Sequence, residues 1–202
     1  METDTYKTLD TPSTEILFKE KKSKFFGYAF PIENEDDVKT IIEDLRKVHH
    51  TANHVCYAWQ LGVEQLRYRA NDDGEPNNSA GMPIYGQIQS FGVTNVLVAV
   101  VRIFGGTKLG VGGLISAYKT AAQLTLETAV IVEKTLKKEF VLYFDYPEMD
   151  KVMRTIKQQQ LEIISQEMTM KCKIRLSVRK QDAPRIEKIF SIMHPVKIVQ
   201  HN

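Results

Sequence analysis

The sequence VLVAVVRIFGGTKLGVGGLISAYKTAAQLTLETA occupies residues 96–129 and contains three successive patterns. Six consecutive apolar residues, Val96–Val101, are rich in valine and predict a strand covered on both faces. Apolar residues recur at helical spacing from Leu114 and predict a helix that runs to about Ala129. A glycine-rich loop, residues 105–113, joins the two. The sequence here therefore predicts a buried strand joined to a helix by a glycine-rich loop, and a buried helix is the alternative for the apolar run.

The glycine-rich loop is a candidate anion site. Glycines let the backbone approach a ligand closely, and the free N–H groups of the following helix point back at the loop. Lys108 adds a positive charge. The loop glycines are Gly105, Gly106, Gly110, Gly112 and Gly113. Their spacing matches neither the P-loop nor the dinucleotide-binding motif, because no Lys-Ser or Lys-Thr pair follows and Ile115 stands where a third glycine would be. A tight packing turn is the alternative.

Toward the N-terminus, residues 14–32 predict strand material interrupted by the basic cluster Lys19–Lys24. Asn34 is expected to cap a helix that ends near His50, since acidic residues fill its first turn. Residues 55–62 and 65–70 predict two short strands. A helix is expected to start after Pro83.

An acidic loop lies between these strands and that helix. Asp72, Asp73 and Glu75 lie within four residues and could bind a divalent cation, perform acid–base chemistry, contact a partner or simply form an Asp-Gly turn. They do not match the twelve-residue calcium loop. His54 and Cys56 precede them, but no paired ligand spacing supports a zinc site, and their spacing does not favour a nucleophile–base pair. We expect no metal and no cofactor.

The C-terminal part has a different pattern of predicted strands and helices. From residue 140 onward the patterns follow the order strand, helix, strand, strand, helix, strand, which predicts a ferredoxin-like βαββαβ domain. Its strand KCKIRLSVR, residues 171–179, puts four cations on one face and apolar side chains on the other. The cations are Lys171, Lys173, Arg175 and Arg179. Such a face could follow an RNA backbone, or could be an ordinary solvated surface.

Composition places the chain among ordinary globular proteins. Its 202 residues are 43% hydrophobic and 26% charged, which excludes a disordered or fibrous chain. Two cysteines cannot form a disulfide scaffold and fit a reducing compartment, and no apolar run approaches membrane-spanning length. We expect a cytoplasmic protein of two domains, 1–133 and 134–202. The first contains 13 Lys and Arg against 17 Asp and Glu, and the second contains 14 against 8. The second is therefore basic enough to attract a polyanion.

Four segments together resemble the Impact/YigZ family: SKFFGYAFPI, NHVCYAW, DDGEPNNSAGMPI and VVRIFGGTKLGVGGLISAYKTAA. The resemblance spans about residues 20–130, and the tail is similar to the small domain of bacterial members. It implies an α+β protein whose first domain is an α/β sandwich like domain 2 of a small-subunit ribosomal protein and domain IV of elongation factor G. The ferredoxin-like second domain would resemble domain V of that factor. By position, the resemblance singles out six residues and the loop glycines; the six are His54, Asp72, Asp73, Glu75, Arg102 and Lys108. Family arginines are replaced by Met82 and Ser116, and a family tyrosine by Ile103.

The residues and the resemblance favour a non-catalytic regulator linked to translation. Eukaryotic relatives regulate a starvation-responsive kinase that controls translation initiation. We expect the partner to be RNA, the ribosome or a translation-related protein, and a small-molecule substrate or a membrane is not expected. The alternatives are a protein–protein regulator of a stress response and a metal-assisted hydrolase that uses the acidic loop.

Overall fold

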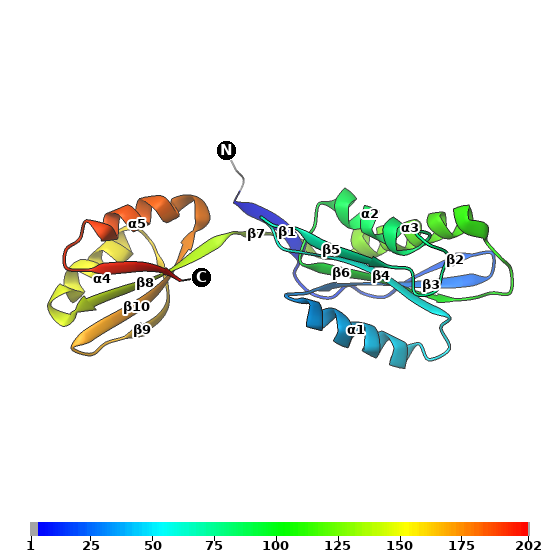
Figure 1. Ribbon diagram of the computed structural model, residues 1–202, viewed down its shortest axis with the longest axis horizontal. Coiled ribbons are helices and arrows are strands. Elements are labelled where there is room, and N and C mark those ends of the chain that lie inside the picture. Colours follow the sequence, from blue (N-terminus) through cyan, green and yellow to red (C-terminus); the bar gives the residue numbers. More distant parts are fainter. Residues whose placement is uncertain (1–3, 202) are drawn as a thin grey trace. The chain divides into compact units, whose positions relative to one another are not determined.

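The computed structural model describes residues 4–201, and the chain divides into two compact units. Tyr6–Lys134 form the N-terminal unit, and residues 135–201 form the C-terminal unit together with residues 4–5. Both units combine helices with antiparallel sheets, so the chain is a mixed α/β protein (Figure 1).

A five-stranded antiparallel sheet is the centre of the N-terminal unit. The strand order is β2-β3-β6-β4-β5. The strands are β2 (Ile16–Glu20), β3 (Ser23–Pro31), β4 (His54–Leu61), β5 (Arg67–Asn71) and β6 (Val96–Ile103). The central strand β6 is buried from Val96 to Arg102, as its valine-rich run predicts. The basic cluster Lys19–Lys24 spans the end of β2, the two-residue turn and the start of β3.

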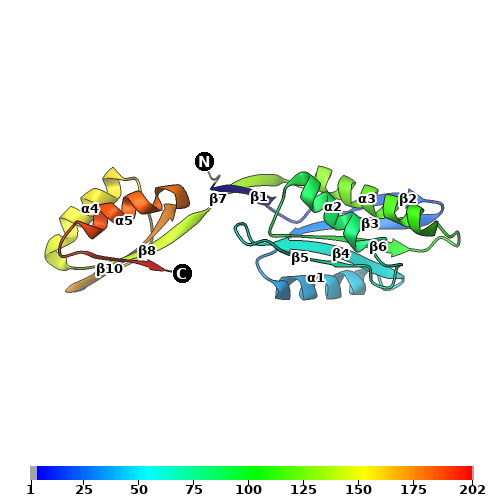
Figure 2. The ribbon, with the colours of Figure 1, turned by 45° about the horizontal axis from the view of Figure 1, so that its top comes forward.

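Helices cover both faces of this sheet. The helix α1 (Glu35–Val48) lies on one face, and α2 (Gly81–Phe91) and α3 (Gly110–Thr128) lie together on the other (Figures 1 and 2). The predicted cap of α1 is confirmed. The Asn34 side chain accepts from the backbone N–H groups of Asp36 and Asp37, and the Asp37 carboxylate accepts from the Asn34 N–H. Because α1 and α2–α3 each bury an apolar stripe, the sheet has an apolar core on each side.

Two strands lie where the sequence predicts none. β1 (Thr5–Leu9) pairs with β7 (Ile131–Thr135) in a separate two-stranded sheet. β1 contains only five residues and has no clear alternation, so its pairing partner is visible only in three dimensions. The boundary between the two units runs through this pair.

The C-terminal unit is a four-stranded antiparallel sheet with two helices on one face (Figure 1). The elements are β8 (Lys137–Asp145), a short 3-10 turn η1 (Tyr146–Glu148), α4 (Met149–Gln158), β9 (Glu162–Glu167), β10 (Lys171–Arg179), a second turn η2 (Lys180–Asp182), α5 (Ala183–Ser191) and β11 (Lys197–His201). They follow the predicted order of strands and helices, and the sheet order is β11-β8-β10-β9. The apolar set of β10 faces the helices, as predicted.

One ion pair joins the beginning of the chain to this unit. Two guanidinium nitrogens of Arg179, Nε and Nη2, donate to the Asp4 carboxylate, at 2.7 and 2.9 Å. The bonds from Arg179 hold the pKa of the Asp4 carboxyl below its usual value. The folded state thus favours the ionised form of Asp4.

We expect Asp4→Asn to lower the stability of the C-terminal unit at pH 7. Because the pKa of Asp4 is lower in the folded than in the unfolded chain, its contribution is complete above about pH 4 and disappears as the pH falls through the folded value. The difference between wild type and variant should therefore shrink below about pH 4. Urea unfolding followed by circular dichroism measures the free energy of unfolding. Trp59 fluorescence reports the N-terminal unit, so the transition that appears only in circular dichroism belongs to the C-terminal unit. Glu187→Gln removes an exposed carboxylate from the same unit as the control, and a constant Asp4→Asn deficit from pH 7 to 2 would contradict the role of the pair.

Candidate functional site

The glycine loop is shorter than its sequence predicts. The helix α3 begins at Gly110, so Gly110, Gly112 and Gly113 belong to its first turn and only Gly105 and Gly106 precede it. No described side chain caps this end, and the first turn has no acidic residue. The first N–H groups of a helix have no intrahelical partner, and they carry the positive end of the helix dipole. The start of α3 therefore combines uncapped N–H groups with a partial positive charge, which are the features of a helix start that can bind an anion.

The β2–β3 turn lies directly against this loop. A Cβ atom on Gly105 would come within 2.1 Å of the Lys22 carbonyl, and the Gly105 N–H donates to the Ser23 hydroxyl at 3.2 Å. Lys21 and Lys22 form the exposed turn in left-handed backbone conformations. Together with exposed Lys108 they bring three cations to the same end of the unit, and none of the three forms an ion pair with any residue from 4 to 201. We call this region, residues 21–22, 104–109 and the first turn of α3, the glycine-loop end.

A pocket of about 430 Å³ opens at the glycine-loop end. Apolar side chains form much of its wall, and polar groups lie at its base and rim. The lining residues include Phe104, Leu109, Val111 and Leu114, and also His54, Glu75, Arg102 and Lys108. This volume falls within the range of pockets that take one small ligand. The structure thus brings together the acidic loop, His54 and the glycine loop, which lie far apart in the sequence.

Arg102 and Glu75 form a buried ion pair at the base of this pocket. Nη1 of Arg102 lies 2.6 Å from Oε1 of Glu75, and both side chains are at least nine-tenths buried. The Tyr118 hydroxyl donates to the same oxygen at 2.8 Å. Glu75 therefore already balances the charge of Arg102, for which the sequence predicts anion binding. The Nε of Arg102 is covered and finds no acceptor among the described residues.

The other members of the acidic loop bind backbone groups. The Asp72 carboxylate accepts from the N–H groups of Asn78, Ala80 and Gly81, and so it caps the start of α2. The Asp73 carboxylate accepts from the Val55 N–H and from Arg46, both at 2.6 Å. Within residues 4–201, no three His, Cys, Asp or Glu side chains come together as a metal-ligating group. The expectation that the loop carboxylates form one cleft with Glu75 is therefore wrong for Asp72 and Asp73, whose roles here are structural.

His54 has a defined tautomer. Its Nδ1 lies 2.8 Å from the backbone oxygen of Asp73, and a carbonyl oxygen can only accept, so Nδ1 carries the proton. In the neutral ring Nε2 is then an acceptor, and it lies 3.8 Å from Oε1 of Glu75. His54 is thus oriented by the acidic loop and lines the pocket.

Cys56 is buried next to this network. Its thiol donates to the backbone oxygen of Asp72 at 3.0 Å and contacts the Tyr118 hydroxyl at 3.3 Å. Burial raises the pKa of the Cys56 thiol far above its usual value, and burial likewise raises the pKa of Tyr118. A protonated, covered thiol is a poor nucleophile, so Cys56 packs rather than reacts.

The basic strand β10 presents its cations as predicted, but neighbouring strands neutralise them. Lys173 pairs with Glu167 of β9 at 3.3 Å, Arg175 donates to Glu139 of β8 at 2.7 Å, and Arg179 pairs with Asp4. Lys171 lies opposite Asp145 in the β8–β10 register. The expected open cationic face is therefore corrected to a mixed surface, because each cation has a carboxylate close by or opposite.

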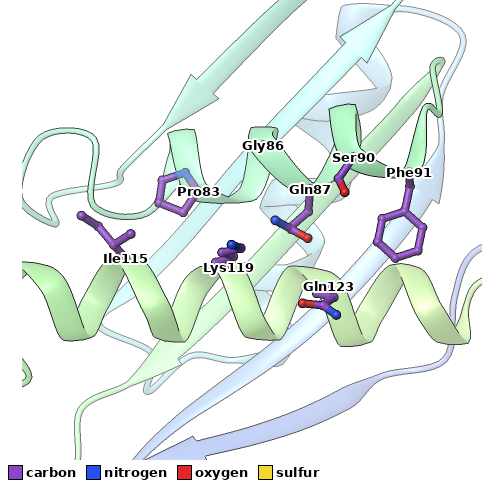
Figure 3. Close-up of a pocket in the computed structure, with 8 residues that line it drawn as sticks. All are labelled: Pro83, Gly86, Gln87, Ser90, Phe91, Ile115, Lys119 and Gln123. Atoms are coloured by element: carbon purple, nitrogen blue, oxygen red, sulfur yellow. The ribbon is translucent and has the colours of Figure 1, made fainter.

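A second hollow lies on the outer face of the N-terminal unit, between α2 and α3. Figure 3 shows Pro83, Gly86, Gln87, Ser90 and Phe91 of α2 facing α3. From α3, Ile115, Lys119 and Gln123 complete the groove of about 730 Å³ (Figure 3). Lys119 is an exposed lysine on α3 that lies outside the glycine-loop pocket, which makes it a matched control for Lys108.

Sequence reasoning missed two features of the site. Tyr118 fits the helical apolar stripe of α3, and only its hydroxyl hints at the bond to Glu75. Lys21 and Lys22 form a visible basic cluster, but nothing in the sequence links the hairpin turn to a loop some 80 residues later. The close approach at Gly105 makes that link.

Comparison with known proteins decides the family. Residues 21–126 match the Impact N-terminal domain, a span of just over half of the chain. This protein belongs to the IMPACT family. An IMPACT family member from Haemophilus influenzae is 34% identical over 162 residues, which cover 77% of either chain. YvyE of Bacillus subtilis is 31% identical over 69% of this chain and 64% of its own length, and YigZ of Escherichia coli is 34% identical over 64% of each chain. The family resemblance read from the motifs is confirmed.

Solved structures add information about the fold. A crystal structure of a hypothetical protein superposes with a TM-score of 0.71 over 99% of this IMPACT protein and 98% of that chain, at 24% identity. A structure of the two-domain translational regulator Yih1 reaches a TM-score of 0.36 over 59% of this chain and 46% of that chain, at 26% identity, which is too low to bear on function. Among the residues from 4 to 201, no helix is long and apolar enough to cross a membrane.

The replaced family arginines lie away from the pocket. Met82 is in the first turn of α2 and Ser116 is in the second turn of α3, and both are exposed. Neither lines the pocket at the glycine-loop end. Their replacement therefore leaves the pocket's own donors unchanged.

Proposed function

We propose that this IMPACT family protein is a cytoplasmic, non-catalytic regulator of translation that binds RNA, free or within the ribosome, at the glycine-loop end. One observation carries the proposal: Lys21, Lys22 and Lys108 are exposed, without carboxylate partners among the described residues, beside the uncapped start of α3. RNA backbones bind where unpaired cations and helix N-termini gather. Family membership supports the link to translation.

The C-terminal sheet is a weaker candidate for the RNA contact. Its cations already form ion pairs with carboxylates, so a phosphate would have to displace Glu167, Glu139 or Asp4. Such exchange yields little net electrostatic gain. We therefore assign the main contact to the N-terminal unit, although the sequence alone favours the basic tail.

We also propose the two fold classes that the resemblance implies. The βαββαβ order and the sheet order β11-β8-β10-β9 support a ferredoxin-like C-terminal unit. The five-stranded sheet with helices on both faces supports an α/β sandwich like domain IV of elongation factor G for the N-terminal unit. Two buried free cysteines support a reducing compartment.

We expect binding of a single-stranded oligoribonucleotide to depend on salt. Three lysine–phosphate contacts predict a slope of about −2 for the logarithm of the association constant against the logarithm of the salt concentration. Raising the salt from about 50 to 200 mM should therefore weaken binding roughly 20-fold. Filter binding measures this. No binding, or an affinity that ignores salt, would contradict the proposal, and a lysate partner that resists nuclease would favour protein recognition instead.

A further inference from the structure

The pocket at the glycine-loop end contains hydrogen-bond donors that have no acceptor among the described residues. Arg102 Nε is covered and lacks an acceptor among residues 4–201, although its Nη1 is paired with Glu75. Leaving a buried donor without a partner is costly. The first N–H groups of α3 are uncapped by any described side chain, and Lys108 lies at the rim. Arg102, Lys108 and the start of α3 all line this one small pocket, so they suit a negatively charged ligand group with several oxygens.

An aromatic surface adjoins these donors. Phe104 lines the pocket and is 42% exposed, and the Arg102 guanidinium lies 5.5 Å from its ring centroid. Val111 and Leu114 extend the apolar wall. Nucleic-acid bases stack on exposed aromatic rings without regard to sequence. An aromatic wall beside an anion site therefore matches a nucleotide, with its phosphate at the start of α3 and its base on the wall.

We propose that this pocket takes the terminal phosphomonoester of an RNA strand, which carries up to two negative charges and three free oxygens, where an internal phosphodiester carries one charge. This inference rests on the proposed RNA binding. A pocket of about 430 Å³ has room for one nucleotide. The end of the strand enters the pocket, and Lys21 and Lys22 contact the phosphates that follow.

The test compares three 12-nucleotide single strands of one sequence, which carry a 5′-phosphate, a 3′-phosphate or hydroxyls at both ends. Fluorescence anisotropy of internally labelled strands with the full-length protein gives each Kd. We expect one phosphorylated strand to bind at least about tenfold more tightly than the hydroxyl strand, since charge-assisted bonds to the terminal group are strong. The matching nucleoside monophosphate, AMP with its phosphate at the 5′ or 3′ position, should compete, whereas adenosine should not.

Two variants connect this preference to the pocket. Lys108→Ala should reduce it, and Lys119→Ala, the same change elsewhere on the surface of the unit, should preserve it. Val111→Asp puts a carboxylate at the start of α3, where it favours the helix but repels a phosphate, so it should abolish the preference in a folded protein. Equal binding of all three strands would overturn the terminal-phosphate inference and leave RNA binding intact. If no strand binds while AMP does, the RNA proposal fails and the pocket assignment stands; if neither binds, both fail.

Discussion

Glu75→Ala should lower the free energy of unfolding of the N-terminal unit by about 3–5 kcal/mol. Glu75 balances the Arg102 guanidinium at 2.6 Å, and both side chains are almost completely buried. Removing the carboxylate leaves a buried positive charge without a partner, and it also strips the Tyr118 hydroxyl of its acceptor. Trp59, the single tryptophan, is buried in this unit, so its fluorescence in urea follows the relevant transition.

Two further variants separate charge from packing at this site. Glu75→Gln keeps an oxygen acceptor but removes the charge, so its deficit should be smaller than that of Glu75→Ala. The double variant Glu75→Leu, Arg102→Met replaces the pair by apolar side chains and should recover most of the loss, since buried ion pairs gain little over good packing. A Glu75→Ala deficit below about 1 kcal/mol would show that the ion pair does not organise the pocket.

Gly105→Ala should lower the free energy of unfolding of the N-terminal unit by about 2–3 kcal/mol and also weaken RNA binding, because overpacking against the backbone forces the chain to move. The added Cβ would meet the Lys22 carbonyl carbon and oxygen at 2.1 Å and the Ser23 nitrogen at 2.5 Å. The contact is with main-chain atoms, so no side chain can rotate away. The hairpin turn must separate from the glycine loop, which moves Lys21 and Lys22 away from Lys108.

Gly86→Ala is the matched control. Gly86 lies inside α2, outside the glycine-loop end, and a Cβ atom there meets nothing within 4 Å among the described residues. Alanine favours the helix by up to about 1 kcal/mol, so this variant should be as stable as wild type or more so. Trp59 fluorescence and RNA binding of both variants provide the comparison. Equal behaviour of the two would contradict a requirement for close approach at Gly105.

The sequence predicts much of the fold because local patterns dominate it. The valine run of β6, the capped helix α1 and the alternation of β10 each report a periodicity that burial then satisfies. The ion-pair partner of each charged side chain does not follow from these local patterns. Lys173 and Arg175 look free within their own strand, and their carboxylates come from β9 and β8, whose register a single strand does not reveal. Arg179 finds its partner 175 residues away, at Asp4.

The candidate site shows the same division. Lys108, Gly110 and Glu75 belong to motifs that are visible in the sequence, and the structure brings them to one pocket. That Asp72 caps α2, and that Arg102 is balanced by Glu75, depends on where free N–H groups and buried charges come to lie. Sequence spacing alone does not encode those positions. The C-terminal part looks like the binding surface in the sequence because a count of charges does not show which cations are paired with carboxylates.

RNA affinity of two triple variants with equal charge change tests the assignment most directly. One variant is Lys21→Ala, Lys22→Ala, Lys108→Ala at the glycine-loop end, and the other is Lys171→Ala, Lys173→Ala, Arg175→Ala on the C-terminal sheet. Measured by filter binding at about 100 mM salt, the first should lose at least about 20-fold in affinity and most of its salt dependence, whereas the second should stay within about threefold of wild type. The reverse outcome would contradict the account, because RNA would then be held by the C-terminal sheet.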